Sequence, residues 1–213
     1  YMLLGDASAV DENSKELIES AGRHNYTYFK NIGELQRSWT LTRARAPDLR
    51  RMGAQRLSAG LAVLEKTGIG LGIRSFYSQL ALAQIGLGEK SKAMLSASKA
   101  AGRQKLGTRS WDAEVQRVLG EVMRMSPDPD HAGALECFHS AMRIAREQGG
   151  GTFEIRAALS GARLLRDMSR TGEARALLSA SMARVEEGTT DAAEAKQFLK
   201  QLPVEIESSG PVH

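Results

Sequence analysis

Helical segments separated by short breaks recur along almost the whole chain, and this recurrence constrains the fold more than any other feature. From about residue 12 onward, apolar residues follow the 3.6-residue period of a helix, and no segment alternates apolar and polar residues long enough to form a strand. The breaks are rich in Gly, Pro, Asp and Thr, which end helices and form turns. Helices of about 12 to 18 residues joined by short turns fold as antiparallel hairpins. The sequence therefore predicts an all-α protein.

The expected helices follow from the periodic segments between the breaks. Asp191 is expected in the N-cap region of the last one, which we interpret as a capping helix. The polar, proline-bearing stretch 203–213 is expected to be a flexible C-terminal tail. The predicted helices cover residues 12–23, 26–45, 49–66, 73–86, 89–103, 109–125, 131–148, 153–169, 172–187 and 191–201.

The hairpins also share a period. Their first helices start near residues 28, 74, 111 and 153, and their second helices near 50, 89, 131 and 172. These starts are about 40 residues apart, between the lengths of tetratricopeptide and HEAT repeats. No hairpin can bury its apolar face alone, so successive hairpins stack with a continuous core. We predict antiparallel helix hairpins stacked as a tetratricopeptide-like right-handed superhelix over residues 28–202, preceded by the remnant of another repeat at 1–27.

Small and large residues recur where a tetratricopeptide repeat needs them. A Gly or Ala lets two helices pack closely, and a large residue opposite fills the wedge between neighbouring hairpins. We assign these structural repeat positions to Tyr77, Leu80, Ala81, Gly88, Ala93 and Ala100 in one unit, to Leu119, Gly120, Ala134, Phe138 and Ala141 in the next, and to Ala162 and Ala174 in the one after.

Composition limits the class of protein further. Aromatic residues make up only 5% of the chain, so the core must come mostly from Ala, Leu, Met, Ile and Val. No apolar run approaches the roughly 18 residues of a membrane span, and the first residues do not resemble a signal peptide. The lone Cys137 excludes an internal disulfide and fits a reducing compartment. We therefore predict a cytoplasmic protein with no membrane partner.

The densest basic stretch lies between Arg37 and Arg56 and contains a single acidic residue, Asp48. Such a stretch can meet phosphates or an acidic partner. The alternative is the solvated face of two helices and their connecting turn, and we favour it because nucleic-acid binders carry a denser basic stripe with interleaved aromatic residues. We accordingly expect no nucleic-acid partner.

Two glycine-rich segments resemble phosphate-binding loops only superficially. Gly68 to Gly72 follows a predicted helix rather than a strand, and Gly86 to Ser91 lacks the adjacent Gly-Lys of a P-loop. Both are expected to be interhelical turns. We interpret Trp39 and Trp111 as core residues, with the lining of a peptide groove as the alternative.

The remaining candidate sites also favour structural roles. Cys137 and His139 point about 200° apart on a helix, so they cannot share a tetrahedral metal ion with His131. Asp128 and Asp130 provide too few oxygens for calcium and suit a helix start instead. The sequence therefore predicts no catalytic residue, no cofactor and no metal site.

Five segments of the chain carry a resemblance to a known family: RSWDAEVQRVLGE from Arg109, DPD from Asp128, ALECFHSAMRIAREQG from Ala134, EIRAALSGARLLRD from Glu154 and EAKQFL from Glu194. They resemble one bacterial group, the tetratricopeptide-like C-terminal region of class III adenylate/guanylate cyclases that also carry a STAND-type ATPase module. The resemblance extends over residues 28–202 and is most specific at 109–170. Related repeat regions follow the ATPase in some bacterial transcriptional regulators.

The resemblance implies that cyclase and ATPase modules lie upstream and that the repeats bind a signal or a partner. The chain opens at Tyr1, for which a fragment of a longer protein is the simplest explanation. We therefore expect a protein-interaction or sensor module that binds a protein or peptide on its concave face, or neighbouring domains of its own chain. The alternatives are part of a nucleotide cyclase and part of a STAND-type transcriptional regulator.

Overall fold

The computed structural model describes residues 2, 5–68, 70, 72–102, 109–126, 128–184 and 189–203. Within these residues the chain forms helices and turns and contains no β-strand, so the predicted all-α class is confirmed. The helices are α1 (Ala7–Arg23), α2 (Thr27–Thr42), α3 (Pro47–Lys66), α4 (Ile73–Gly86), α5 (Lys90–Gly102), the 3₁₀ turn η1 (Arg109–Trp111), α6 (Asp112–Arg124), α7 (His131–Glu147), α8 (Gly151–Asp167), α9 (Thr171–Met182) and α10 (Thr190–Gln201).

Two of the predicted helix starts are corrected by capping residues. Helix α1 begins five residues before the expected start at 12, because the Asp6 carboxylate accepts a hydrogen bond from the backbone N–H of Ala9 at 3.0 Å. Thr189, not Asp191, is the N-cap of α10 and accepts from the N–H of Ala192 at 3.1 Å. Asp191 lies in the first turn, where a carboxylate also favours the helix dipole.

Other boundaries shift by a few residues. Helix α8 begins at Gly151 rather than at 153, because the chain turns at Gly149, with φ 66°, and Gly150 already caps the helix. Helix α2 ends at Thr42, three residues before the predicted end, and α9 ends at Met182. Residues 185–188 and the predicted tail beyond Pro203 lie outside the described residues.

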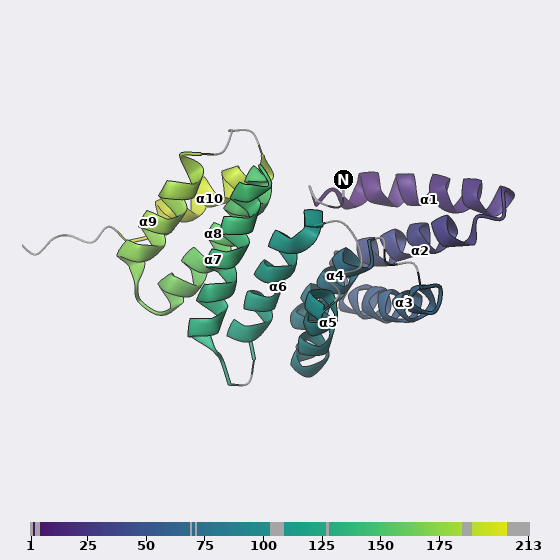
Figure 1. Ribbon diagram of the computed structural model, residues 1–213, viewed down its shortest axis with the longest axis horizontal. Helices are drawn as coiled ribbons and strands as arrows, with labels where there is room; N and C mark the ends of the chain where they lie inside the picture. The colour runs from purple at the N-terminus through teal and green to yellow at the C-terminus, as the bar shows by residue number, and fades with distance from the viewer. Residues whose placement is uncertain are drawn as a thin grey trace, which may run out of the picture.

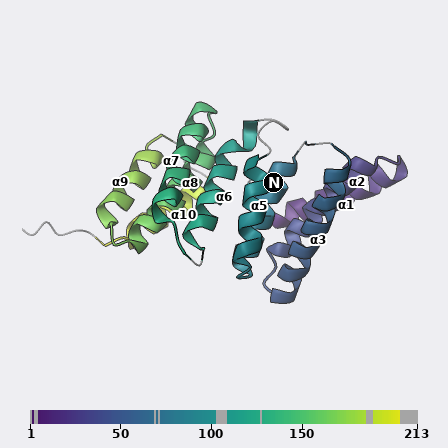
Figure 2. The ribbon, with the colours of Figure 1, turned by 60° about the horizontal axis from the view of Figure 1, so that its bottom comes forward.

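Neighbouring helices pack against each other along an elongated molecule. Figure 1 shows the chain running from α1–α3 at one end, through α4 and α5, to α7–α10 at the other. Every helix from α1 to α9 packs on the next one along the chain. Turned by 60°, the ribbon shows α5 and α6 side by side where the two halves join (Figure 2).

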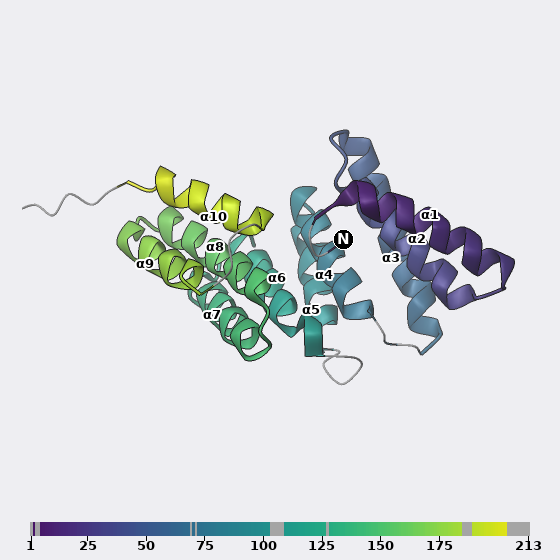
Figure 3. The same cartoon turned by 90° about the horizontal axis from the view of Figure 1, so that it is seen from above.

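A second set of contacts joins alternate helices. Helix α4 packs on α6, α6 on α8 and α8 on α10, with a smaller contact between α2 and α4. The first helices of the predicted hairpins, α2, α4, α6 and α8, therefore form one continuous row, and α10, expected as a capping helix, extends it at its end. Seen from above, α1 and α10 lie on the same side of the molecule, toward its opposite ends (Figure 3).

The core is built mainly from aliphatic side chains and runs through the whole row. One cluster joins α1 to α4 and extends to Val115 of α6, and another joins α7 to α10. Smaller clusters around Val118 and Phe138 lie between them. Burial of these side chains is the main term that stabilises the stack.

One buried cation ties the two halves together. Arg74 of α4 is only 4% exposed, and its Nε donates to the carbonyl oxygen of Ala100 at 3.1 Å. Its guanidinium also pairs with Asp112 at the start of α6. A buried charge is tolerated only when it is paired and hydrogen-bonded, as this one is. Arg74 therefore fixes α4, α5 and α6 in one arrangement.

Candidate functional site

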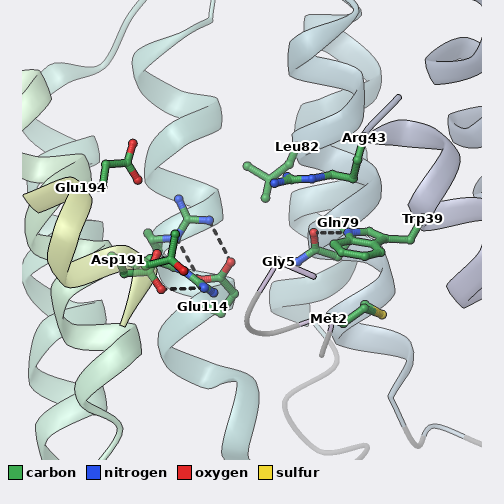
Figure 4. Close-up of a pocket in the computed structure, with 12 residues that line it drawn as sticks. Met2, Gly5, Trp39, Arg43, Gln79, Leu82, Glu114, Asp191 and Glu194 are labelled. Atoms are coloured by element: carbon green, nitrogen blue, oxygen red, sulfur yellow. Dashed lines mark hydrogen bonds and ion pairs between the residues drawn. The ribbon is translucent and has the colours of Figure 1, made fainter. Parts of the chain in front are cut away.

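A groove of about 240 Å³ opens along the row of first helices. Alternate helices α2, α4, α6, α8 and α10 supply its walls, and the N-terminal residues Met2 and Gly5 border it. Figure 4 shows Trp39, Gln79 and Arg43 on one wall and Glu114, Asp191 and Glu194 on the other. The remaining lining residues are Leu82, Arg117, Arg156 and Thr190.

The first wall presents an arginine stacked on an immobilised indole. Trp39 is 1% exposed, and its Nε1–H donates to Oε1 of Gln79 at 2.9 Å, which joins α2 to α4. The guanidinium carbon of Arg43 lies 5.6 Å from the centre of the Trp39 ring, within the range of a cation–π interaction. A guanidinium held against a fixed ring loses little further freedom when it binds an anion.

The second wall is built from arginine–carboxylate pairs. Arg117 donates through Nε and Nη2 to both oxygens of Glu114, each at 2.8 Å. Arg156 of α8 binds both oxygens of Asp191 of α10, at 2.9 and 2.8 Å. Two parallel hydrogen bonds fix geometry as well as charge, so these pairs make the wall rigid.

Arg117 of this wall and the neighbouring Glu121, 3.6 Å away, each shift the pKa of the other. Burial alone would lower the pKa of Arg117, but Glu114 and Glu121 outweigh it and raise that pKa above its ordinary value. Burial would likewise raise the pKa of Glu121, but Arg117 and Arg124 hold it below its usual value. Arg117 and Glu121 therefore stabilise each other as an ion pair at the base of this wall.

A buried carboxylate behind this wall gives the fold a pH dependence. Glu154 is 4% exposed and accepts from Nε of Arg146 at 2.7 Å and from Nη2 of Arg184 at 2.8 Å. Burial would raise the pKa of Glu154, but the hydrogen bonds from Arg146 and Arg184 outweigh it and lower that pKa. Its folded pKa is therefore below the unfolded value of about 4.3, so its stabilisation is complete above that value and is lost as the pH falls through the folded pKa.

The variant Glu154→Gln is accordingly expected to be less stable than the parent at pH 7, with a difference that narrows as the pH falls from about 5 to 3. Thermal unfolding followed by circular dichroism across this range measures the difference. Glu147→Gln is the control, because the one ion pair of Glu147 among the described residues is the exposed pair with Arg143, and the variant should cost little at pH 7. A Glu154→Gln difference that stays constant down to pH 3 would contradict the assigned role.

The predicted structural repeat positions lie behind the groove rather than in it. All of them are buried except Leu119, which is half-buried, and Gly88, which is exposed in the turn between α4 and α5. Tyr77 is buried, and its hydroxyl donates to Glu65 at 2.6 Å. None of the thirteen positions lines the groove. The structure thus places together a set of side chains that differs from the set singled out in the sequence.

Sequence patterns pointed to only part of the groove. Trp39 was expected in the core, with a groove as the alternative, and it is both buried and at the edge of the groove. Trp111 is half-buried and packs edge-to-face on Phe153. Gln79, Arg117 and Arg156 were not anticipated. These side chains could have been found in the sequence, because they are polar residues that lie next to the buried positions of α4, α6 and α8.

The other sequence candidates fall in turns and caps. Gly68 to Gly72 lies between α3 and α4, although residues 69 and 71 are outside the described part. Asp130 is the N-cap of α7 and accepts from the N–H of Gly133 at 2.8 Å. His139 is exposed, and Cys137 is half-buried near the sulfur of Met123. Burial raises the pKa of the Cys137 thiol.

Two kinds of feature are absent from the described residues. No helix there is long and apolar enough to cross a membrane. No cluster of three or more His, Cys, Asp or Glu side chains in the same residues is arranged to hold a metal ion.

The chain was also compared with known proteins. No protein-family model matches it, and no curated protein matches it either.

Proposed function

We propose that this chain is a tetratricopeptide-like interaction module that binds a peptide or a segment of a protein in the groove between Trp39 and Glu194. Hairpins repeating about every 40 residues support a superhelix of this kind. In such a stack the first helices line one face along its whole length. The ligand would lie across several repeats at once.

One observation carries the proposal: a single groove draws its lining from five alternate helices. An extended ligand placed there touches residues that are far apart in the sequence and close in space. The lining combines an arginine held against the buried Trp39, the half-buried Leu82 and rigid ion pairs, so it offers some apolar contact together with fixed polar groups. This combination is typical of surfaces that recognise peptides, which need both anchoring area and hydrogen-bond partners.

The test uses two variants that introduce the same bulky side chain on different faces. Thr190→Tyr narrows the groove from α10, whereas Ser58→Tyr fills a separate pocket of about 400 Å³ formed by α3, α4 and α5. Both Thr190 and Ser58 are exposed, so both variants should fold. Peptides are first selected on the parent chain from a random 12-residue display library, and their affinities for the three proteins are then measured by fluorescence anisotropy.

We expect Thr190→Tyr to weaken the selected peptides by about tenfold or more, since a filled groove forfeits most of their contact area. Ser58→Tyr should leave their affinities within about twofold. The reverse pattern, in which Ser58→Tyr weakens binding and Thr190→Tyr does not, would place the binding surface at the pocket of α3, α4 and α5 and refute the proposal. Failure to select any peptide that depends on the groove would refute it as well.

The bacterial cyclase resemblance supplies a second, wider proposal. The resemblance to the repeat region of class III cyclases with a STAND-type ATPase is most specific at residues 109–170. This stretch includes α6 and α8, which supply Glu114, Arg117 and Arg156 to the groove. Binding in the groove would then bias an attached catalytic module, because a ligand shifts any equilibrium between states that it binds unequally. If the upstream coding sequence contains a cyclase domain, nucleotide cyclisation by the full-length protein should change on deletion of residues 28–202. Identical activity with and without them would refute this role.

A further inference from the structure

We propose that a small pocket between Arg43 and Arg50, at the α2 end of the groove, binds a carboxylate of an acidic peptide segment. This inference rests on the proposed function and specifies the chemistry of the ligand. The pocket has a volume of about 100 Å³ and shares Trp39, Arg43, Gln79 and Leu82 with the groove. A peptide lying in the groove can therefore place one side chain in it.

Arg50 provides the first argument. Its Nε is fully buried and has no hydrogen-bond partner among the described residues. A buried donor without an acceptor is costly, and more so when it belongs to a cation. Neither Arg50 nor Arg43 has a carboxylate within 4.0 Å in the described part of the chain, so both retain their capacity for an anion.

The second argument is the way the pocket is built. Arg43 is stacked on the ring of Trp39, and a hydrogen bond to Gln79 holds that ring in place. One guanidinium is therefore fixed at the rim of the pocket. Thr42, whose hydroxyl bonds the carbonyl of Trp39, adds a polar group to the lining. Two guanidinium groups with planar, forked donors match the two oxygens of a carboxylate.

Charge pairing differs between the stretch from Arg43 to Arg56 and the helices from α6 onward. From α6 onward most arginines bind a carboxylate, as Arg117, Arg124, Arg143 and Arg156 do. In contrast, no described carboxylate lies within 4.0 Å of any arginine between 43 and 56. This surplus of positive charge around the pocket attracts an acidic segment and raises its rate of association.

The opposite wall distinguishes a peptide from a nucleic acid. A ligand that reaches from Arg43 across the groove meets Glu114, Asp191 and Glu194 (Figure 4). A peptide can present an acidic side chain to the first wall and a neutral or basic one to the second. A uniformly anionic phosphate backbone would be repelled by the second wall.

Nuclear magnetic resonance of the ¹⁵N-labelled chain tests the pocket directly, because each arginine gives its own Nε–H signal. The probe is acetyl-tetraglutamate amide, and inorganic phosphate and an eight-nucleotide single-stranded DNA are titrated in parallel. We expect the Arg50 signal to move to a saturated position with tetraglutamate and to move less with phosphate or DNA. Arg50→Ala should weaken tetraglutamate binding about tenfold or more, as the loss of a charge-assisted bidentate contact implies.

Arg56→Ala is the matched control, since Arg56 is an exposed arginine of the same helix and has no carboxylate partner in the part of the chain that the structure describes. It removes the same charge from α3 and should change the affinity by less than about twofold. Arg50→Lys keeps the charge, loses the forked donors and should bind weakly, and circular dichroism verifies that all three variants fold.

Three results would overturn the proposal: a shift of the Arg50 signal that never saturates, equal weakening by Arg56→Ala and Arg50→Ala, or tighter binding of phosphate or DNA than of tetraglutamate. This test and the test of the groove can fail independently of each other. Peptides that depend on Thr190 but not on Arg50 would leave the proposed function intact and refute only the carboxylate pocket. Saturable tetraglutamate binding without any groove-dependent peptide would refute only the proposed function.

Discussion

Replacing Arg117 by leucine is expected to lower the free energy of unfolding by about 3 to 5 kcal/mol, the usual cost of removing one partner of a buried ion pair. Arg117 binds both oxygens of Glu114 at 2.8 Å and lies 3.6 Å from Glu121. The Glu114 side chain is only 3% exposed and has no other cation within 4.0 Å among the described residues. The variant would leave this carboxylate buried and unpaired, so it must be protonated, hydrated or exposed.

Urea unfolding at pH 7, followed by circular dichroism, measures the loss. Arg143→Leu is the matched control, because Arg143 and Glu147 form an exposed pair four residues apart on α7. Pairs of that kind contribute less than about 1 kcal/mol. The double variant Glu114→Gln/Arg117→Leu should recover part of the loss, since it removes the unpaired charge. Equal losses for Arg117→Leu and Arg143→Leu would show that Glu114 is not buried as described.

Much of the fold was predictable because helix formation leaves a local signature. The apolar period located ten helices, and most of their ends agree within a few residues, since Gly and Pro mark helix ends directly. The start of α1 and the capping residue of α10 were missed for a physical reason. Asp6 and Thr189 act through one hydrogen bond each, and neighbouring polar residues, such as Asp191, suit the same position equally well by type.

The groove was much harder to predict, since it depends on contacts between residues distant in the sequence. Arg156 and Asp191 are 35 positions apart, and Trp39 and Gln79 are 40 apart. Periodicity shows which face of a helix is buried, but the order in which helices stack decides which polar residues meet. The basic stretch between Arg37 and Arg56 illustrates the same limit. Most of its arginines are exposed, as expected of a solvated face, yet Arg50 carries a buried Nε that no pattern revealed.

The small residues at helix crossings were predictable from the repeat pattern, and Gly120 makes the sharpest case. A Cβ added there would lie 2.7 Å from Cε1 of Phe138 and 3.0 Å from the carbonyl oxygen of Ala134. Phe138 is fully buried, so its ring has little room to move aside. Gly120→Leu is therefore expected to lower the free energy of unfolding by about 3 kcal/mol, the upper part of the range for overpacked cores. Urea unfolding measures this loss as well.

The control is a glycine in an open position, where leucine should change the free energy of unfolding in the opposite direction. Gly22 lies within α1, and a Cβ there would meet no atom within 4 Å. Gly22→Leu should therefore stabilise the chain by up to about 1 kcal/mol, because leucine is the better helix former. The double variant Gly120→Ala/Phe138→Leu should lose less than the sum of its single changes, since the smaller side chain removes the atoms that the new Cβ would strike. Gly120→Leu without any loss would mean that α6 and α7 do not cross at this glycine, and the repeat register built on it would have to be redrawn.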